Sequence, residues 1–178
     1  MVTRIISGQS IRGLLLYNEN KVTGNEANLI MASRFGTELN RLDFDAKLAR
    51  FEHLTFLKPN VKTNAIHIIL NFDRDDKLDL VTFQQLAASY MDRIGFGEQP
   101  YLVYQHQDAS HPHLHIVTTN INAQGERMDI HGIGRTASET ARKELEIEYN
   151  LIKAEGRQKS EALPKGKIIG DHQHIGRI

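Results

Sequence analysis

The residues best suited to chemistry are four histidines within ten residues, at positions 106, 111, 113 and 115. Residues two apart on a β-strand point to the same face, so His111, His113 and His115 would line one face. If residues 107–110 close a hairpin, His106 lies opposite His111. It then lies diagonally from His113, within reach of a ring side chain. The spacing therefore allows His106, His113 and His115 to converge on one ion.

A site made of imidazoles without thiolates has a restricted chemistry. The chain contains no cysteine, which excludes disulfides, thiolate zinc sites and cysteine nucleophiles. Three histidines suit a zinc, manganese, nickel or cobalt ion with open coordination positions, and open positions indicate catalysis or substrate binding. Asp108 follows His106 by two residues. It can accept a ring N–H from a ligand histidine, or it can act as a general base.

Other interpretations of the same histidines stay open. Residues 111–117 also fit the alternating pattern of histidine-triad hydrolases, in which His113 would accept a phosphoryl group without a metal. A non-catalytic module that binds DNA or metal would keep the histidines for binding alone. The least specific interpretation is a solvent-facing strand that is rich in histidine.

Three stretches have the alternation or the apolar content of strands: 63–72, 101–106 and 111–121. In the first of them, Ile66, Ile68 and Leu70 share one face. His67 takes the opposite face, where it either neighbours the site in the sheet or, as we expect, has a structural role. Residues 27–35 are ambiguous, and residues 126–131 are a candidate fourth strand.

Four stretches carry apolar residues at helical spacing: 8–17, 43–57, 83–94 and 136–155. Ser10 and Asp43 are suited to cap the first two helices. Residues 18–25 contain Asn, Gly and Lys and are expected to form a loop. Helices interspersed with hairpin-joined strands favour an antiparallel α+β sheet over a parallel one.

Composition limits the class of protein without pointing to a partner. The 178 residues carry 22 Lys+Arg and 22 Asp+Glu, so the overall charge does not indicate nucleic-acid binding. Because the chain has neither an apolar run of about 20 residues nor a signal-peptide core, we expect no membrane insertion. We expect one domain over residues 1–155. Residues 156–178 are polar and basic, and they are either a tail that can clamp DNA or the start of a C-terminal extension.

The histidine stretch also resembles a motif of a known family. The third motif of mobilisation-type relaxases is similar to the pattern His106-x-Asp108-x-x-His111-Pro112-His113-x-His115-x4-Asn120. These HUH-class endonucleases nick plasmid and transposon DNA for conjugation. Residues 11–22, which contain Tyr17, resemble the first motif, residues 67–72 the second, and residues 90–104 the segment before the third. The resemblance spans residues 5–155 and is greatest to relaxases of Bacteroides-type mobilisable elements.

The resemblance implies a fold and a set of site residues. The fold is an antiparallel sheet flanked by helices, with the histidines on central strands. The metal ligands of the family correspond to His106, His113 and His115, and its nucleophile corresponds to Tyr17. An acidic residue beyond the second motif often assists in relatives, and Asp76 is its best positional match.

The chain departs from the family at the second motif. A serine often lies near position 69 or 71 in relatives, whereas this chain has Ile69 and Asn71. The contact to DNA on the 3′ side is therefore not assigned. Tyr104 shares a strand face with His106 and is the alternative nucleophile.

By this resemblance the protein would be a cytoplasmic, bacterial relaxase. It would nick one DNA strand at a transfer origin through a 5′-phosphotyrosine intermediate and rejoin it during conjugative mobilisation. Its cofactor would be a divalent ion, either Mn2+, Mg2+ or Zn2+. Its partners would be single-stranded DNA beside a hairpin of the transfer origin and accessory mobilisation proteins.

Overall fold

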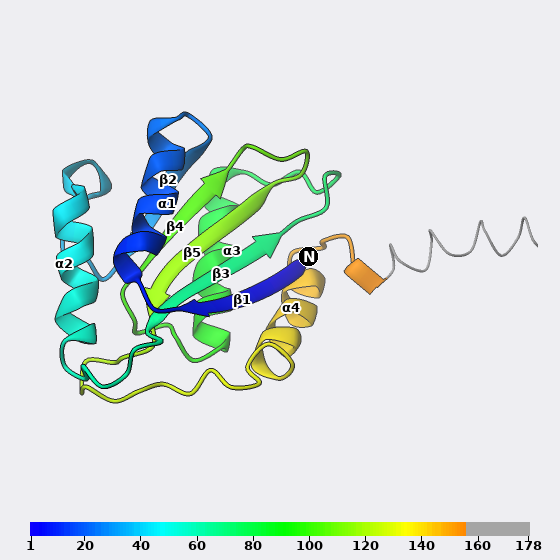
Figure 1. Ribbon diagram of the computed structural model, residues 1–178. Coiled ribbons are helices and arrows are strands. Elements are labelled where there is room, and N and C mark those ends of the chain that lie inside the picture. Colours follow the sequence, from blue (N-terminus) through cyan, green and yellow to red (C-terminus); the bar gives the residue numbers. More distant parts are fainter. Residues whose placement is uncertain (156–178) are drawn as a thin grey trace, which may run out of the picture.

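The computed structural model describes residues 1–155, and it has one sheet with helices on both faces (Figure 1). No helix in this part of the chain is long and apolar enough to cross a membrane. In chain order the elements are β1 (Val2–Gly8), α1 (Ile11–Thr23), β2 (Ala27–Ser33), the 3-10 helix η1 (Leu39–Arg41), α2 (Phe44–Thr55), β3 (Ala65–Asn71), α3 (Leu80–Arg93), β4 (Tyr101–His106), β5 (His113–Thr119) and α4 (Ala137–Glu148).

Residues 156–178, the expected tail or extension, lie outside the described residues. Their proposed use as a clamp on DNA therefore remains a prediction. The same holds for the domain boundary after residue 155.

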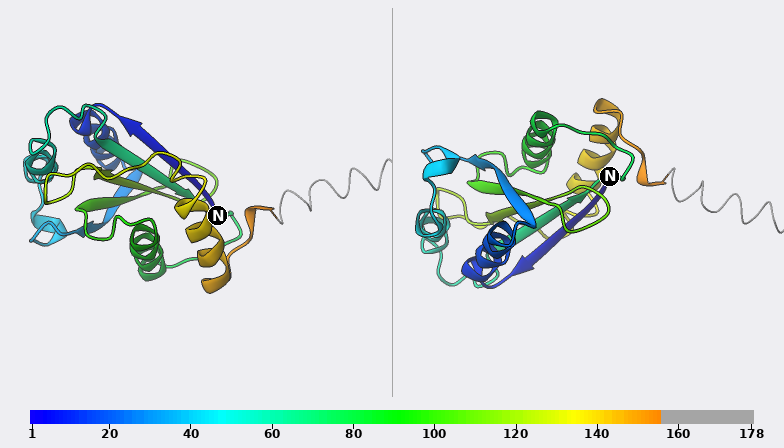
Figure 2. Two further views of the ribbon diagram at one scale, coloured as in Figure 1. Left: turned by 90° about the horizontal axis from the view of Figure 1, so that it is seen from below. Right: turned by 90° about the horizontal axis from the view of Figure 1, so that it is seen from above.

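The five strands lie in the order β1-β3-β5-β4-β2, and every neighbouring pair is antiparallel. Helices α1 and α2 cover one face of the sheet, and α3 and α4 cover the other (Figure 2). This arrangement confirms the predicted α+β fold with a central antiparallel sheet. It places β4 and β5, which carry the histidines, in the interior of the sheet.

Alternation along the strands divides the apolar core between the two faces of the sheet. Ile66 and Leu70 of β3 are fully buried and pack in the cluster that includes the apolar residues of α3 and α4. Val117 of β5 packs in the second cluster, with residues of α1 and α2. His113 and His115 lie four and two residues before Val117, so they belong to the face covered by α1 and α2.

Helix α1 begins as predicted, with the hydroxyl of Ser10 accepting a backbone N–H of the first turn at 2.9 Å. It continues to Thr23, so the prediction of a loop over 18–25 is wrong for most of that segment. Asparagine is a weak helix former, and tertiary contacts decide the outcome here. Asn18 is fully buried against the sheet, and the helix ends only at Gly24.

The structure also differs from the sequence analysis in two further strands, one predicted but absent and one present but not predicted. Residues 126–131 form no strand, and Arg127 makes a single β-bridge with Ile121. In contrast, residues 2–8 form the edge strand β1, which no sequence pattern indicated. Each face of β1 mixes polar and apolar residues, with Arg4 beside Ile6 on one of them, so the period-2 signal is weak.

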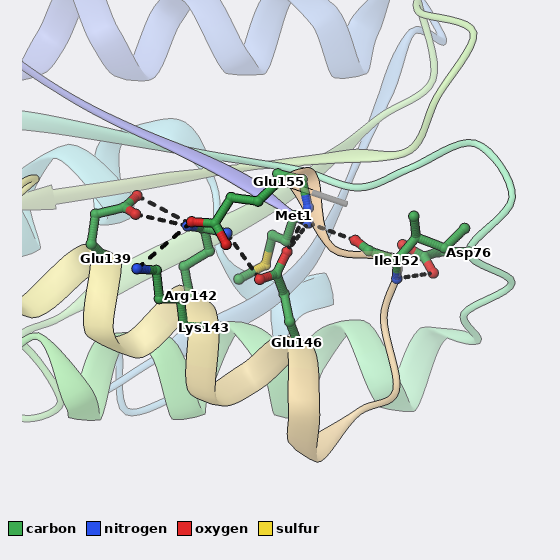
Figure 3. A network of polar contacts seen from close by, with 9 residues as sticks. Met1, Asp76, Glu139, Arg142, Lys143, Glu146, Ile152 and Glu155 are labelled. Atoms are coloured by element: carbon green, nitrogen blue, oxygen red, sulfur yellow. Dashed lines mark hydrogen bonds and ion pairs between the residues drawn. The ribbon is translucent and has the colours of Figure 1, made fainter. Parts of the chain in front are cut away.

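A buried ionic network attaches the start of β1 to α4 (Figure 3). The Met1 ammonium donates to Glu146 Oε2 at 2.8 Å and to the carbonyl of Ile152 at 3.2 Å. Arg142 donates to Glu146 Oε1 at 2.9 Å, so both oxygens of this buried carboxylate are paired. Asp76 joins the network because its Oδ1 accepts from Ile152 N at 3.1 Å. The network thus connects β1, α4 and the loop between β3 and α3.

Glu146→Ala should destabilise the fold strongly. The change leaves the Met1 ammonium and Arg142 without their shared partner, and breaking a buried ion pair from one side costs about 3–5 kcal/mol. Urea denaturation should show a fall of that size in the free energy of unfolding. Glu144→Ala is the control, because Glu144 pairs with Arg93 at the surface and its loss should cost less than about 1 kcal/mol. Equal effects of the two changes would contradict the prediction.

Candidate active site

The pairing of β4 with β5 decides where the histidines lie. His106 is directly opposite His113, and Tyr104 is opposite His115. The prediction that His106 lies opposite His111 is wrong. The connection between the strands runs from 107 to 112 and is therefore longer than the expected turn. His111 lies in this connection, with its ring centroid 5.8 Å from that of His113.

The three predicted metal ligands converge in spite of the different register. One nitrogen from each of His106, His113 and His115 lies within 4.8 Å of the other two. The rings of His106 and His115 stack with their centroids 3.6 Å apart. The ring centroid of His113 is 5.3 Å from that of His106 and 4.9 Å from that of His115. This arrangement suits a divalent ion held by three imidazoles.

A fourth histidine, His67, belongs to the same cluster. It lies on β3, next to β5, and its Nε2 is 2.8 Å from His115 Nδ1. His115 Nε2 is in turn 2.9 Å from His113 Nδ1, so the three rings form a chain. The alternation of β3 already placed His67 opposite the apolar face. To place His67 at the site, the sequence would also have to show that β3 and β5 are neighbours, and no local pattern contains this information.

Burial keeps these imidazoles neutral. Removal from water is the main cause that lowers the pKa of His67 and His106 to about 4 and that of His115 to about 2. Burial also lowers the pKa of His113, against the opposing effect of the Asp108 carboxylate. Neutral rings retain a lone pair for a metal ion and bring no charge of their own to the site.

The two ring nitrogens of His106 have different surroundings. His106 Nε2 is 2.8 Å from Oδ1 of the buried Asn18. The other ring nitrogen, His106 Nδ1, is buried and has no hydrogen-bond partner among residues 1–155. A buried polar atom without a partner is costly, and coordination to a metal would satisfy it. The cluster therefore fits the divalent ion that the resemblance implies.

Asp108 lies at the rim of the cluster and is bound to α1. Its Oδ2 accepts from Lys21 Nζ at 2.7 Å, and its Oδ1 is 3.3 Å from His113 Nε2. The hydrogen bond from Lys21 is the main cause that lowers the pKa of Asp108 to about 2. A carboxylate with so low a pKa is a weak base near neutral pH. Of the two roles predicted for Asp108, the low pKa disfavours the general base, and the approach to His113 is compatible with orientation of a ligand histidine.

Tyr17 approaches the cluster from α1. Its ring centroid is 6.1 Å from that of His67, 6.2 Å from that of His106 and 6.4 Å from that of His115. Tyr17 is 46% exposed, so a substrate can reach it from solvent. Lys21, about one helical turn further along, has its Nζ 5.8 Å from the Tyr17 ring centroid. The structure thus brings Tyr17 beside the predicted ligands.

Tyr104, the alternative nucleophile, is in a different situation. It is fully buried, and its hydroxyl donates to Glu19 Oε2 at 2.5 Å. Burial raises the pKa of Tyr104, and the hydrogen bond to the Glu19 carboxylate adds to the increase. The other oxygen of Glu19 accepts from Lys47 Nζ at 2.7 Å. These contacts join α1 to β4 and α2 and leave the Tyr104 hydroxyl out of reach of a substrate.

The structure does not bring Asp76, the third predicted catalytic residue, to the cluster. The loop after β3 turns toward the face covered by α3, where Asp76 and Phe83 line the same surface pocket. Asp76 is buried and binds the backbone of Ile152, as described above. This position indicates a structural role for Asp76 and does not support a catalytic one.

A comparison with models of protein families finds a match to the chain. Residues 17–151 match the relaxase family described as MobA/VirD2-like, nuclease domain. The matched region starts at Tyr17 and contains all four histidines of the cluster. No curated protein was found to match the chain.

The lowered histidine pKa values predict how stability depends on pH. The usual pKa of histidine is 6.5, and the folded values are about 4 for His67 and His106 and about 2 for His115. At a pH between the unfolded and the folded pKa values, the unfolded chain binds more protons than the folded chain. The free energy of unfolding is therefore highest above about pH 6.5 and decreases as the pH falls toward 4 and below.

Urea denaturation of chelator-treated protein across this pH range should show the decline in the free energy of unfolding. His115→Asn should make the decline shallower, because it removes the group with the largest of the three shifts. A free energy of unfolding that does not change with pH in the wild type would contradict the prediction.

Proposed function

Because the chain belongs to the MobA/VirD2-like relaxase family of DNA-nicking enzymes, we propose that it cuts one DNA strand at a transfer origin through a covalent tyrosyl–DNA intermediate. The observation that carries the proposal is the position of the exposed Tyr17, whose ring lies between 6.1 and 6.4 Å from three rings of the histidine cluster. A phosphodiester placed between them would meet a hydroxyl and a site for a divalent ion together.

In the proposed reaction the Tyr17 hydroxyl attacks the scissile phosphorus. A bond forms between the tyrosine oxygen and phosphorus, and the bond from phosphorus to the 3′ oxygen breaks. The proton lost by the tyrosine balances the proton gained by the leaving 3′-hydroxyl. The 5′ end stays on Tyr17 as a phosphodiester, which keeps the energy of the cut bond. Attack by a 3′-hydroxyl reverses the step and rejoins the strand.

His106, His113 and His115 are the residues that would hold the divalent ion. When bound, the ion supplies positive charge for the non-bridging oxygens of the phosphate, where negative charge builds in the transition state. Because the three imidazoles are neutral, they leave this positive charge undiminished. Imidazole nitrogens suit zinc better than magnesium, and Mn2+, Mg2+ and Zn2+ are the ions to compare.

Lys21 and Asp108 form the charged rim of the proposed site. The Lys21 ammonium lies 5.8 Å from the centroid of the Tyr17 ring, within the range of a cation–π contact. Its salt bridges to Asp108, at 2.7 Å, and Glu26, at 3.0 Å, hold it in this position. Asp108 in turn contacts His113, so this pair links the helix that carries Tyr17 to the histidines.

The proposed substrate is single-stranded DNA beside a hairpin of the transfer origin, met in the bacterial cytoplasm together with accessory mobilisation proteins. Membership of the relaxase family supports this choice. Since positive and negative residues are equal in number, affinity for phosphate must come from the local arrangement of charged groups rather than from overall charge.

The two alternative functions explain less of the geometry. A histidine-triad hydrolase would use His113 as its nucleophile. It would give no functional role to Tyr17 or to the pair Lys21–Asp108. A non-catalytic binding module needs no exposed hydroxyl beside the histidines. Neither alternative explains the match to the nuclease domain of relaxases.

Tyr17→Phe should abolish covalent attachment to DNA, because it removes the attacking hydroxyl and keeps the ring. The full chain is incubated with Mn2+ and a single-stranded oligonucleotide from the transfer origin of the encoding element. The measurement is the amount of protein–DNA adduct that survives detergent. Tyr104→Phe is the matched control, since it removes a buried hydroxyl, and it should retain the adduct. An adduct in Tyr17→Phe would mean that another residue is the nucleophile.

Removal of the ion should stop the reaction and spare DNA binding. A chelator should abolish the adduct, and added Mn2+ or Zn2+ should restore it. His113→Ala should weaken ion binding in calorimetry by at least about 100-fold, the upper end of the effect of losing even an outer-shell partner. His111→Ala is the control and should bind the ion nearly as the wild type does, because His111 lies outside the ligand group. An adduct that forms equally well in chelator would exclude metal dependence.

A further inference from the structure

Asn18 is a polar residue with no exposure to solvent, and it lies directly after Tyr17 in α1. Both ends of its side-chain amide are used. Asn18 Nδ2 donates to the carbonyl of Leu14 at 3.2 Å, and Oδ1 is 2.8 Å from His106 Nε2. The residue therefore connects the backbone of the helix that carries Tyr17 with one of the predicted metal ligands.

The contact to Leu14 determines which way the amide faces. If the amide were turned over, its oxygen would face the Leu14 carbonyl oxygen, and two acceptors would meet without a proton between them. Asn18 Oδ1 must therefore face His106 and accept a hydrogen bond. Only a protonated Nε2 can donate it, so the proton of the neutral His106 ring lies on Nε2.

A neutral imidazole carries one ring proton, so the lone pair of His106 lies on Nδ1. This nitrogen is buried and has no hydrogen-bond partner in the part of the chain that the structure describes. It is 4.0 Å from Asp108 Oδ1, the same oxygen that lies 3.3 Å from His113 Nε2. His106 Nδ1 and a ring nitrogen of the predicted ligand His113 thus both lie near the same carboxylate oxygen.

We propose that Asn18 is a positioning residue that fixes the tautomer of His106 and directs its Nδ1 toward the divalent ion. The part of this inference that concerns the ion rests on the proposed metal-dependent function, whereas the tautomer follows from the hydrogen bonds alone. Because Tyr17 and Asn18 are consecutive, one turn of α1 places the hydroxyl that attacks and orients a ligand of the ion. Loss of such an outer partner typically lowers metal affinity by about 10–100-fold.

The test uses Asn18→Leu, which keeps the size of the side chain and removes the acceptor, and Asn18→Asp, which keeps an acceptor oxygen in the same place. Calorimetry of the metal-free full chain with Zn2+ and with Mn2+ should show about 10–100-fold weaker binding in Asn18→Leu. Asn18→Asp should restore the affinity. Nitrogen NMR of the metal-free wild type should show His106 protonated at Nε2, and Asn18→Leu should show a mixture of the two tautomers.

Asn64→Leu is the matched control. Asn64 is a partly buried asparagine whose amide also donates to a backbone carbonyl, that of Val61 at 3.2 Å, and among residues 1–155 no hydrogen bond joins it to a histidine of the cluster. It should bind the ions as the wild type does. Thermal unfolding and DNA binding in chelator establish that each variant is folded.

Two results would overturn the proposal. One is a folded Asn18→Leu variant that binds the ions as tightly as the wild type. The other is a wild-type His106 that carries its proton on Nδ1. Failure of the wild type to bind any ion would instead refute the proposed metal dependence, while the NMR measurement would still decide whether Asn18 fixes the tautomer.

Discussion

The site depends on one pairing, that of His106 with His113 between β4 and β5. Directly paired residues on antiparallel strands project to the same face, so this register places two imidazoles together, and alternation along β5 adds His115. A shift by one residue would turn the histidines of the shifted strand toward the apolar face under α3 and α4. Helix α1 can bring Tyr17 beside the histidines only because this register places the histidines on the face that α1 covers.

Helix α1 contributes the groups that the sheet lacks. Three of its residues after Tyr17 each contact a different residue of β4 or of the connection to β5: Asn18 contacts His106, Glu19 contacts Tyr104, and Lys21 contacts Asp108. Helical propensity alone would not maintain a helix through this stretch, and tertiary contacts stabilise it instead. The same contacts that extend the helix therefore also hold Tyr17 over the histidines.

The parts of the fold that could be predicted are those whose pattern is local, such as the caps at Ser10 and Asp43 and the alternation of β3. The convergence of His106, His113 and His115 could be predicted even with a wrong register, because ring side chains meet at direct as well as diagonal positions. The remaining features depend on partners far along the chain. His67 meets His115 across 48 positions, and Asn18 meets His106 across 88. No local pattern contains such contacts.

The long separation between α1 and β5 also has a consequence for the growing polypeptide. A chain is made from its N-terminus, so Tyr17 leaves the ribosome well before the last histidine strand exists. Any fragment that stops short of β5 has the tyrosine but lacks two of the three predicted ligands. The histidine cluster can therefore assemble only after β5 has been made, and a chain truncated before β5 lacks the candidate site.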